Sequence, residues 1–215
     1  MKVLFCCLVL LLLAAATATP AQLPGLLRST DQVTVGKLLV ASEYYMKDPL
    51  FSQTVLLIVQ LGKKGTVGLI LNHPTRANVH QVFPEIDEAW HISNPVFIGG
   101  PVAPHQFFLL VRTNERHENS LQVMDDVSFI SDPNTIKKWL AEEHHKDRIR
   151  LFAGCAGWSP GQLENEIKIG GWNLTQADAK IIFEANSSDL WKNLTARANQ
   201  QEVRFTSKSQ SPTAK

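Results

Sequence analysis

A serine within a hydrolase-like motif is the most obvious candidate for catalysis. Residues 157–161 read Gly-Trp-Ser-Pro-Gly, a G-x-S-x-G pattern that presents the nucleophilic serine in α/β-hydrolases. In those enzymes the catalytic histidine follows the serine along the chain. All seven histidines of this chain precede Ser159, so no later histidine can supply the general base. Ser159 also suits the N-cap of a following helix, and this structural role is the one we expect.

A cysteine shortly before this serine is a candidate for redox or thiol chemistry. Cys155 lies in the sequence Phe-Ala-Gly-Cys-Ala-Gly, close to the N-terminus of the helix expected after it. The partial positive charge at a helix N-terminus favours the reactive thiolate. The alternative is a buried and inert cysteine at the end of a strand. A thiol pKa at or above the ordinary value of about 8.5 would exclude the reactive form.

The histidines do not have the spacing of a metal site. His144 and His145 are adjacent, so on a helix they point about 100° apart and cannot chelate one ion together. The chain also has neither the G-x-x-x-x-G-K-[ST] nor the G-x-G-x-x-G pattern that holds nucleotide phosphates. We therefore expect no metal ion and no other cofactor.

Three glycine- or proline-bearing turns are candidates for a ligand groove. They are expected at residues 72–75, 99–102 and 154–161, after predicted strands. Paired glycines permit a positive φ or the close approach of another segment, so tight strand-exit turns are the simpler interpretation. If the turns meet, Trp158 would form an apolar wall between hydrogen-bonding side chains. The expected ligand-binding residues are Asn72, Pro74, Thr75, Gly99, Gly100, Pro101, Gly157, Trp158 and Gln162.

Short apolar runs predict the strands that would position these turns. The runs at 54–60 and 67–71 flank a polar turn with glycines, which is typical of a β-hairpin. Neither run alternates cleanly between apolar and polar residues, which indicates that both faces of these strands are covered. Further strands are expected at 35–42, 96–98, 107–112, 148–152 and 181–183, with one or two more in 121–130.

Capping signals predict two helices, and a third is expected near the C-terminus. Asp132 before Pro133 marks a helix that should end near Lys146. The segment 159–162 combines an N-cap serine, a first-turn proline and the glutamine of a capping box, and Gly170-Gly171 would close that helix. A last short helix is expected at 188–196. The chain shows no repeats, so we predict one domain of mixed α+β type.

The N-terminal residues are typical of a secretory signal peptide. Lys2 precedes an apolar run that ends in Ala-Thr-Ala, and small residues at this place fit signal peptidase. We expect cleavage after Ala18, a linker over 19–32 and a disordered tail over 201–215. Cleavage would remove Cys6 and Cys7, so the mature chain could form no internal disulfide. The alternatives are an uncleaved membrane anchor or a start site placed too far upstream.

Composition excludes several classes of protein. The 215 residues carry 21 basic and 20 acidic groups, and 44% of them are hydrophobic. This balance is typical of a chain with a packed core and lacks the basic excess of a nucleic-acid binder. After the N-terminal segment no apolar run reaches the roughly 18 residues of a membrane span. We expect neither nucleic acid nor a membrane span in the mature chain.

Several segments together resemble the AlgH/YqgE family of bacterial proteins. The matching segments, in the order of the family, are GKLLVAS (36–42), DPLF (48–51), TVLL (54–57), GLILNHPT (68–75), PVFIGGPV (95–102), GWSPGQLE (157–164) and Trp172. The resemblance implies an AlgH/YqgE-like domain over about 33–200. It also implies a compact α+β fold with a mixed, mostly antiparallel, barrel-like β-sheet core flanked by helices.

The resemblance implies no established enzymatic activity. One branch of the family is described as a regulator of alginate synthesis, sometimes labelled transcriptional. The chain departs from the family in its export signal, since most members look cytoplasmic, and in Cys155, where we would expect an aromatic residue. We predict an exported, non-enzymatic binding or regulatory protein whose partner is a protein or a small ligand. The alternatives are a redox or thiol enzyme using Cys155, a DNA-binding regulator, which the composition disfavours, and a cytoplasmic location.

Overall fold

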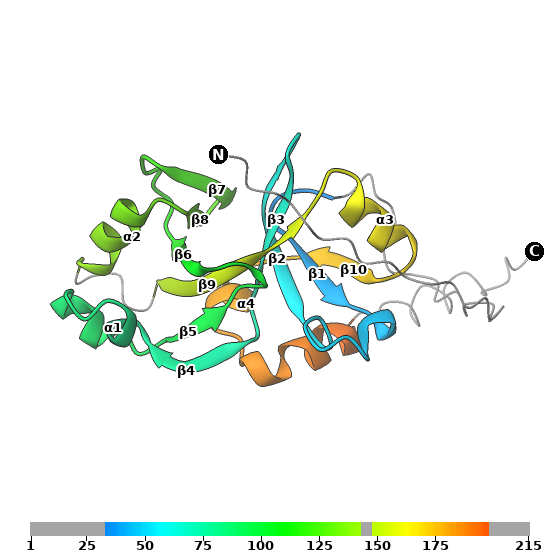
Figure 1. Cartoon of the computed structure of the whole chain (residues 1–215), viewed down its shortest axis with the longest axis horizontal. Coiled ribbons are helices and arrows are strands. Elements are labelled where there is room, and N and C mark those ends of the chain that lie inside the picture. The colour runs from blue at the N-terminus through cyan, green and yellow to red at the C-terminus, as the bar shows by residue number, and fades with distance from the viewer. Residues whose placement is uncertain (1–32, 143–147, 198–215) are drawn as a thin grey trace, which may run out of the picture.

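Ten strands form one curled sheet, and helices cover it (Figure 1). The computed structural model describes residues 33–142 and 148–197. The expected signal peptide, linker, C-terminal tail and residues 143–147, with His144 and His145, lie outside the described residues. The strands are β1 (Lys37–Ala41), β2 (Val55–Gly62), β3 (Gly65–Ile70), β4 (Pro74–Asn78), β5 (Pro95–Ile98), β6 (Val102–Arg112), β7 (Ser120–Met124), β8 (Val127–Ile130), β9 (Ile149–Trp158) and β10 (Trp172–Gln176).

The long strand β9 lies at the centre of the sheet. The strand order is β10-β1-β2-β3-β9-β6-β8-β7; off this path, β5 pairs with β9 and β4 pairs with β5. The pairing of β5 with β9 is parallel and the other pairings are antiparallel. The curl brings β7 back towards the start of β1. A Cβ added to Gly36, just before β1, would lie 2.8 Å from the carbonyl oxygen of Val123 in β7. The predicted barrel-like α+β fold is confirmed.

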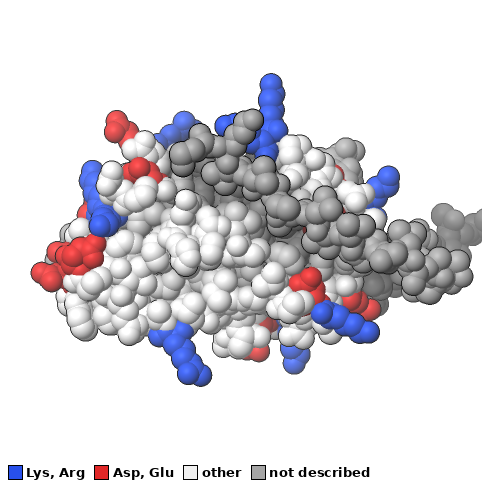
Figure 2. Space-filling view, viewed as in Figure 1, with Lys and Arg blue, Asp and Glu red and all other residues white. Residues whose placement is uncertain are grey.

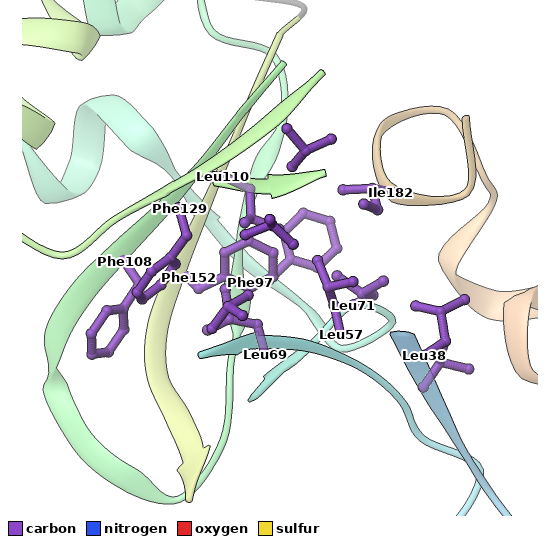
Figure 3. Packing of buried hydrophobic residues seen from close by; sticks show 14 of the residues in the cluster. Leu38, Leu57, Leu69, Leu71, Phe97, Phe108, Leu110, Phe129, Phe152 and Ile182 are labelled. Atoms are coloured by element: carbon purple, nitrogen blue, oxygen red, sulfur yellow. The ribbon is translucent and has the colours of Figure 1, made fainter. Parts of the chain in front are cut away.

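Both faces of the sheet are buried, as the uninterrupted apolar runs predict. Alternate residues of β2 belong to different clusters: Leu57 faces the inside of the curl, whereas Leu56 and Ile58 pack under α3. Figure 3 shows the inner cluster, where Phe97, Phe152 and leucines of several strands meet Ile182. A third cluster lies between β6, β9 and the helices α1 and α2. The sheet is therefore the middle layer of the domain.

Short helices and turns connect the strands and cover the sheet. The helices are α1 (Val79–Val82), α2 (Pro133–Leu140), α3 (Gln162–Lys168) and α4 (Ala179–Phe183), with two short 3₁₀ helices, η2 (Glu43–Tyr45) and η3 (Asp87–His91). Residues 187–197 are helical as well, which agrees with the helix predicted at 188–196. This last helix and α4 pack into the inside of the curl.

The N-terminus of α2 matches its prediction, but its C-terminus does not. Asp132 caps the helix by accepting a hydrogen bond from the backbone N–H of Thr135 at 2.8 Å. Ile136, Trp139 and Leu140 are buried, and the helix ends at Leu140, well before Lys146. In the sequence, residues 142–148 contain no apolar side chain that could extend the buried face. A helix of good formers without tertiary packing is marginal, so the prediction was too long.

The helix predicted from residue 159 begins later. Gly161, with φ +80°, occupies the N-cap position of α3, and Gln162 is its first residue. The Gln162 side chain still accepts from the Ser159 N–H at 3.1 Å, so the capping interaction forms outside the helix. Two glycines close the C-terminus of α3. The Gly170 N–H donates to Ile167 O and the Gly171 N–H to Glu166 O, which is a Schellman motif.

Two segments have other structures than predicted. Residues 181–183, predicted as a strand, belong to α4, because Asp178 caps a helix by accepting from the Ile181 N–H at 2.7 Å. Residues 154–158, predicted as part of a turn, continue β9 to Trp158. Gly154 accommodates this with φ +70° inside the strand. The predicted hairpin of β2 and β3 is confirmed.

Candidate functional site

The predicted turn at 99–102 packs directly against β9. The Gly99 N–H donates to Ala153 O, and Gly99 O accepts from the Ile70 N–H, both at 2.9 Å. A Cβ on Gly99 would lie 2.1 Å from Gly154 O, and one on Gly100 would lie 2.4 Å from Ala156 N. Only glycine permits this distance between two backbones. The structure thus brings residues 99–100 beside residues 154–156.

The turn at 72–75 uses its polar side chains to bind its own backbone. Asn72 Oδ1 accepts from the Val55 N–H, and Asn72 Nδ2 donates to Gln53 O, both at 2.9 Å. Thr75 Oγ1 donates to Val96 O at 2.8 Å. Pro74 is exposed at the start of β4, opposite Phe97. The side chains of Asn72 and Thr75 are therefore engaged in hydrogen bonds to the backbone of neighbouring segments.

Trp158 lies in the core under α3. Its side chain is buried, and its indole N–H donates to Glu166 Oε2 at 2.9 Å. Gln162 is exposed, but its Nε2 donates to Glu166 Oε1 at 2.9 Å. Trp158, which the sequence predicts as the apolar wall of a ligand groove, therefore lies inside the molecule. The apolar surface near Gly157 is formed by other residues.

Glu166 is the polar centre of this region, and the sequence gives no signal for it. Its Oε2 accepts hydrogen bonds from Tyr45 Oη at 3.0 Å, Trp158 Nε1 at 2.9 Å and Trp172 Nε1 at 2.8 Å. Burial, together with the Glu166 carboxylate, raises the pKa of the Tyr45 hydroxyl. These bonds join η2, β9, α3 and β10, so the role of Glu166 is structural.

The two candidate nucleophiles lack the environment that activates them. Within the described residues, the Ser159 hydroxyl has no hydrogen bond to a histidine or a carboxylate, and its backbone N–H contributes to the turn before α3. Cys155 is buried opposite Val102, and burial raises the pKa of its thiol. A reactive cysteine needs a lowered pKa and access to solvent.

Metal binding and membrane spanning find no support in the part of the chain that the structure describes. In residues 33–142 and 148–197, no group of three His, Cys, Asp or Glu side chains is placed to hold a metal ion. Over the same residues no helix has the length and hydropathy to cross a membrane.

An uncharged surface lies beside the packed glycines. From Ala89 to Val111 the sequence contains no Lys, Arg, Asp or Glu. In this stretch Ile98 and Val102 expose 48% and 46% of their area, although both are large apolar residues. Figure 2 shows an area without charged residues over β5, β6 and β9.

We call the exposed residues Ile98, Pro101, Val102 and Gly157 the neutral strip. Gly157 belongs to it because a Cβ at this glycine would lie 3.5 Å from Val102 Cγ2. Ile98 ends β5, Pro101 lies in the turn after it, Val102 begins β6, and Gly157 lies near the end of β9. Of the predicted ligand-binding residues, Pro101 and Gly157 are therefore in the strip, and Gly99 and Gly100 lie beneath it.

These features define a structural class of protein. It is an α+β domain with a curled, mostly antiparallel sheet, and close backbone packing of glycines supports an exposed, uncharged apolar strip. The chain belongs to the AlgH-like family, whose model matches residues 38–202. This confirms the resemblance found in the sequence.

Curated relatives come from bacteria and carry no functional name. The chain is 30% identical to a UPF0301 protein of Parabacteroides distasonis over 159 residues, which are 73% of this chain and 79% of that protein. It is 32% identical to a UPF0301 protein of Paraburkholderia phymatum, with 77% and 88% covered.

Two solved structures have a similar fold. A protein from Corynebacterium diphtheriae, DIP2367, matches with a TM-score of 0.63 and 26% identity over 77% of this chain and 87% of that one. The AlgH protein from Pseudomonas aeruginosa matches with a TM-score of 0.61 over 94% of this chain and all of that one. Its 22% identity supports the shared fold alone.

Proposed function

We propose that this chain is a non-enzymatic binding or regulatory protein and that it binds its partner through the neutral strip. The observation that carries the proposal is the exposure of Ile98 and Val102 on a rigid support. Gly99 and Gly100 pack against β9 and hold the two residues in place. Preorganised apolar side chains lose little conformational entropy when a partner covers them.

The predicted ligand-binding residues have different roles in this proposal. Pro101 and Gly157 touch the partner, whereas Gly99 and Gly100 shape the support. Asn72, Thr75 and Gln162 hold their present hydrogen bonds, and Trp158 stays in the core. Pro74, exposed beside Phe97, extends the contact along β4.

The absence of charged side chains from the neutral strip favours an uncharged contact area on the partner. DNA binding requires a basic surface that replaces counterions, and the segment from Ala89 to Val111 has no basic side chain besides histidine. The thiol-enzyme alternative has less support, since Cys155 is buried with a raised pKa.

We also propose that the chain is exported and cleaved after Ala18. The support is the sequence of residues 1–18 alone. N-terminal sequencing of the protein purified from its source should give a chain that starts at Thr19. An intact Met1 would contradict export by this route and favour a cytoplasmic location.

The binding proposal is tested with matched charge substitutions. Wild type, Val102→Glu and Leu121→Glu serve as baits for capture from the source organism. Leu121 is 45% exposed on β7 and so matches Val102 in exposure. A partner that binds both wild type and Leu121→Glu should be lost with Val102→Glu, and the purified partner should bind that variant at least about tenfold more weakly. Equal binding by all three baits would contradict the proposal.

A further inference from the structure

Apart from the neutral strip, the molecule has a pocket of about 350 Å³ lined by residues of three segments. Phe83, which follows α1, Phe107 of β6 and Ile136 of α2 form its apolar floor. The two phenyl rings meet edge to face, with centroids 5.4 Å apart. Small-molecule sites typically measure roughly 300–1,000 Å³, so this volume suits a small ligand.

A bulge in β6 builds one wall of the pocket. Val102 pairs with Cys155, but the next pairing joins Phe107 with Ala153, so residues 103–106 leave the ladder. Ala103 begins the bulge with φ +49°, a conformation that L-residues rarely adopt. The bulge places His105 and Gln106 at the rim. Strained backbone of this kind is concentrated at functional sites.

The chemistry of the lining selects uncharged ligands. His105, Gln106 and Ser131 supply the polar groups, and Pro133 completes the apolar surface. No Asp, Glu, Lys or Arg is among the residues that line the pocket. The N-terminus of α2 offers no anion site, because Asp132 already accepts from the Thr135 N–H and hydroxyl. A charged ligand would lose its hydration without gaining a partner of opposite charge.

An ion pair connects the two sides of the pocket. Lys137 Nζ of α2 lies 2.8 Å from Glu85 Oε1, which belongs to the segment after α1. Both side chains are about half exposed, so the pair contributes little to stability. Lys137 directly follows Ile136 in the sequence, and Glu85 lies two residues after Phe83. The ion pair therefore links the two segments that carry Ile136 and Phe83.

We propose that this pocket binds a small, uncharged aromatic molecule with an amide or a similar hydrogen-bonding group. The aromatic ring packs against Phe83, Phe107 and Ile136. The polar group exchanges hydrogen bonds with the Gln106 amide and the Ser131 hydroxyl at the rim. This proposal does not depend on the neutral strip, because no strip residue lines the pocket.

The test compares benzamide with benzoate, which has nearly the same shape and a negative charge. Ligand-detected NMR with the full chain should show saturable binding of benzamide, with a Kd at least about tenfold lower than that of benzoate. Equal or tighter binding of benzoate, or no saturable binding of benzamide, would overturn the proposal.

Two tryptophan substitutions locate the binding. Gln106→Trp places an indole at the rim and should abolish benzamide binding, whereas Gln60→Trp on β2 should leave its Kd unchanged. Both glutamines are exposed, so both variants should keep the thermal unfolding temperature of wild type. Benzamide binding that survives Gln106→Trp in folded protein would contradict the assignment. If Gln106→Trp fails to fold, Ser131→Trp, at another exposed residue of the lining, replaces it with the same expectation.

Discussion

At the scale of single residues, Glu166 is expected to contribute strongly to stability. Three donors, Tyr45, Trp158 and Trp172, converge on one of its oxygens. Hydrogen bonds to a charged acceptor are stronger than those between neutral groups, and a buried donor without a partner costs free energy. The carboxylate therefore secures the end of β9 on which Gly157 lies.

Replacing Glu166 by alanine should lower the free energy of unfolding by about 2–4 kcal/mol, because two indole N–H groups and one hydroxyl lose their acceptor. Urea denaturation followed by tryptophan fluorescence measures this. Glu164→Ala on the same helix is the matched control and should change stability by less than about 0.5 kcal/mol. A similar loss in both variants would show that the hydrogen bonds at Glu166 contribute little.

The hydroxyl of Tyr45 should titrate at unusually high pH. Its pKa in the folded state is raised above the ordinary value of 10.0, so the folded state keeps the proton longer than the unfolded state does. The stability linked to this proton is complete below pH 10 and is lost as the pH rises further. The difference in tyrosinate absorbance between wild type and Tyr45→Phe gives the titration of Tyr45. A midpoint near 10 in folded protein would contradict the geometry at Glu166.

Arg150 is a buried cation inside the curl. Its side chain is 5% exposed; Nη1 donates to Leu71 O at 3.2 Å, the guanidinium lies over the ring of Phe97, and Nε has no hydrogen-bond partner. Burial lowers its pKa to about 10, which means that the folded state disfavours its charge. The sequence gives no sign of this, since β9 reads as an ordinary apolar strand.

Arg150→Met should therefore raise the free energy of unfolding by about 1–2 kcal/mol, because an apolar side chain of similar length removes the cost of the buried charge. Arg76→Met, at an exposed position of β4, serves as the control and should have little effect. Denaturant titration at pH 7 measures both. A loss of stability in Arg150→Met would mean that the bond to Leu71 and the contact with Phe97 outweigh the desolvation of the guanidinium.

Among the elements, the contact between the β5–β6 turn and β9 depends on glycine. Gly99→Ala should lower the free energy of unfolding by about 3 kcal/mol or more, because the new methyl group would lie 2.1 Å from Gly154 O. Gly62→Ala is a suitable control, since a Cβ there meets nothing within 4 Å. Thermal unfolding of both variants measures the difference. A well-folded, fully stable Gly99→Ala variant would show that the two backbones can separate.

The elements that the sequence predicts well are those with a local signal. Asp132 and Pro133 mark the start of α2, and the glycines after α3 mark its end. The prediction of a strand at 181–183 is wrong, because the helix-capping signal at Asp178 outweighs the strand preference of the β-branched residues in this segment. Short strands such as β4 and β10 have no apolar run of their own and form by pairing with β5 and β1.

The candidate site was predictable in part. The paired glycines at 99–100 correctly indicate a close contact between two backbones, because such a contact requires glycine and glycine is visible in the sequence. The partners of Glu166 and the burial of Trp158 were not predictable, because they depend on Tyr45 and Trp172, which lie far from α3 in the sequence. Side chains that meet only through tertiary packing leave no mark in local spacing.

At the scale of the whole molecule, one face carries an uncharged area beside a filled sheet. The inside of the curl is filled by α4 and the helix over 187–197, so it is core and not a cavity for ligands. Charged side chains lie around the uncharged area in Figure 2. Exposed apolar residues in such an area are typical of a surface that a partner covers. The proposed binding function rests on this arrangement.

The most direct test places a photo-crosslinking residue at the surface in question. p-Benzoylphenylalanine replaces Val102 in one variant and Leu121 in another, and both are irradiated in the living source organism. The proposed function predicts a discrete covalent adduct from position 102 and none from position 121. An adduct formed equally from both positions, or formed from position 121 alone, would contradict binding through the neutral strip.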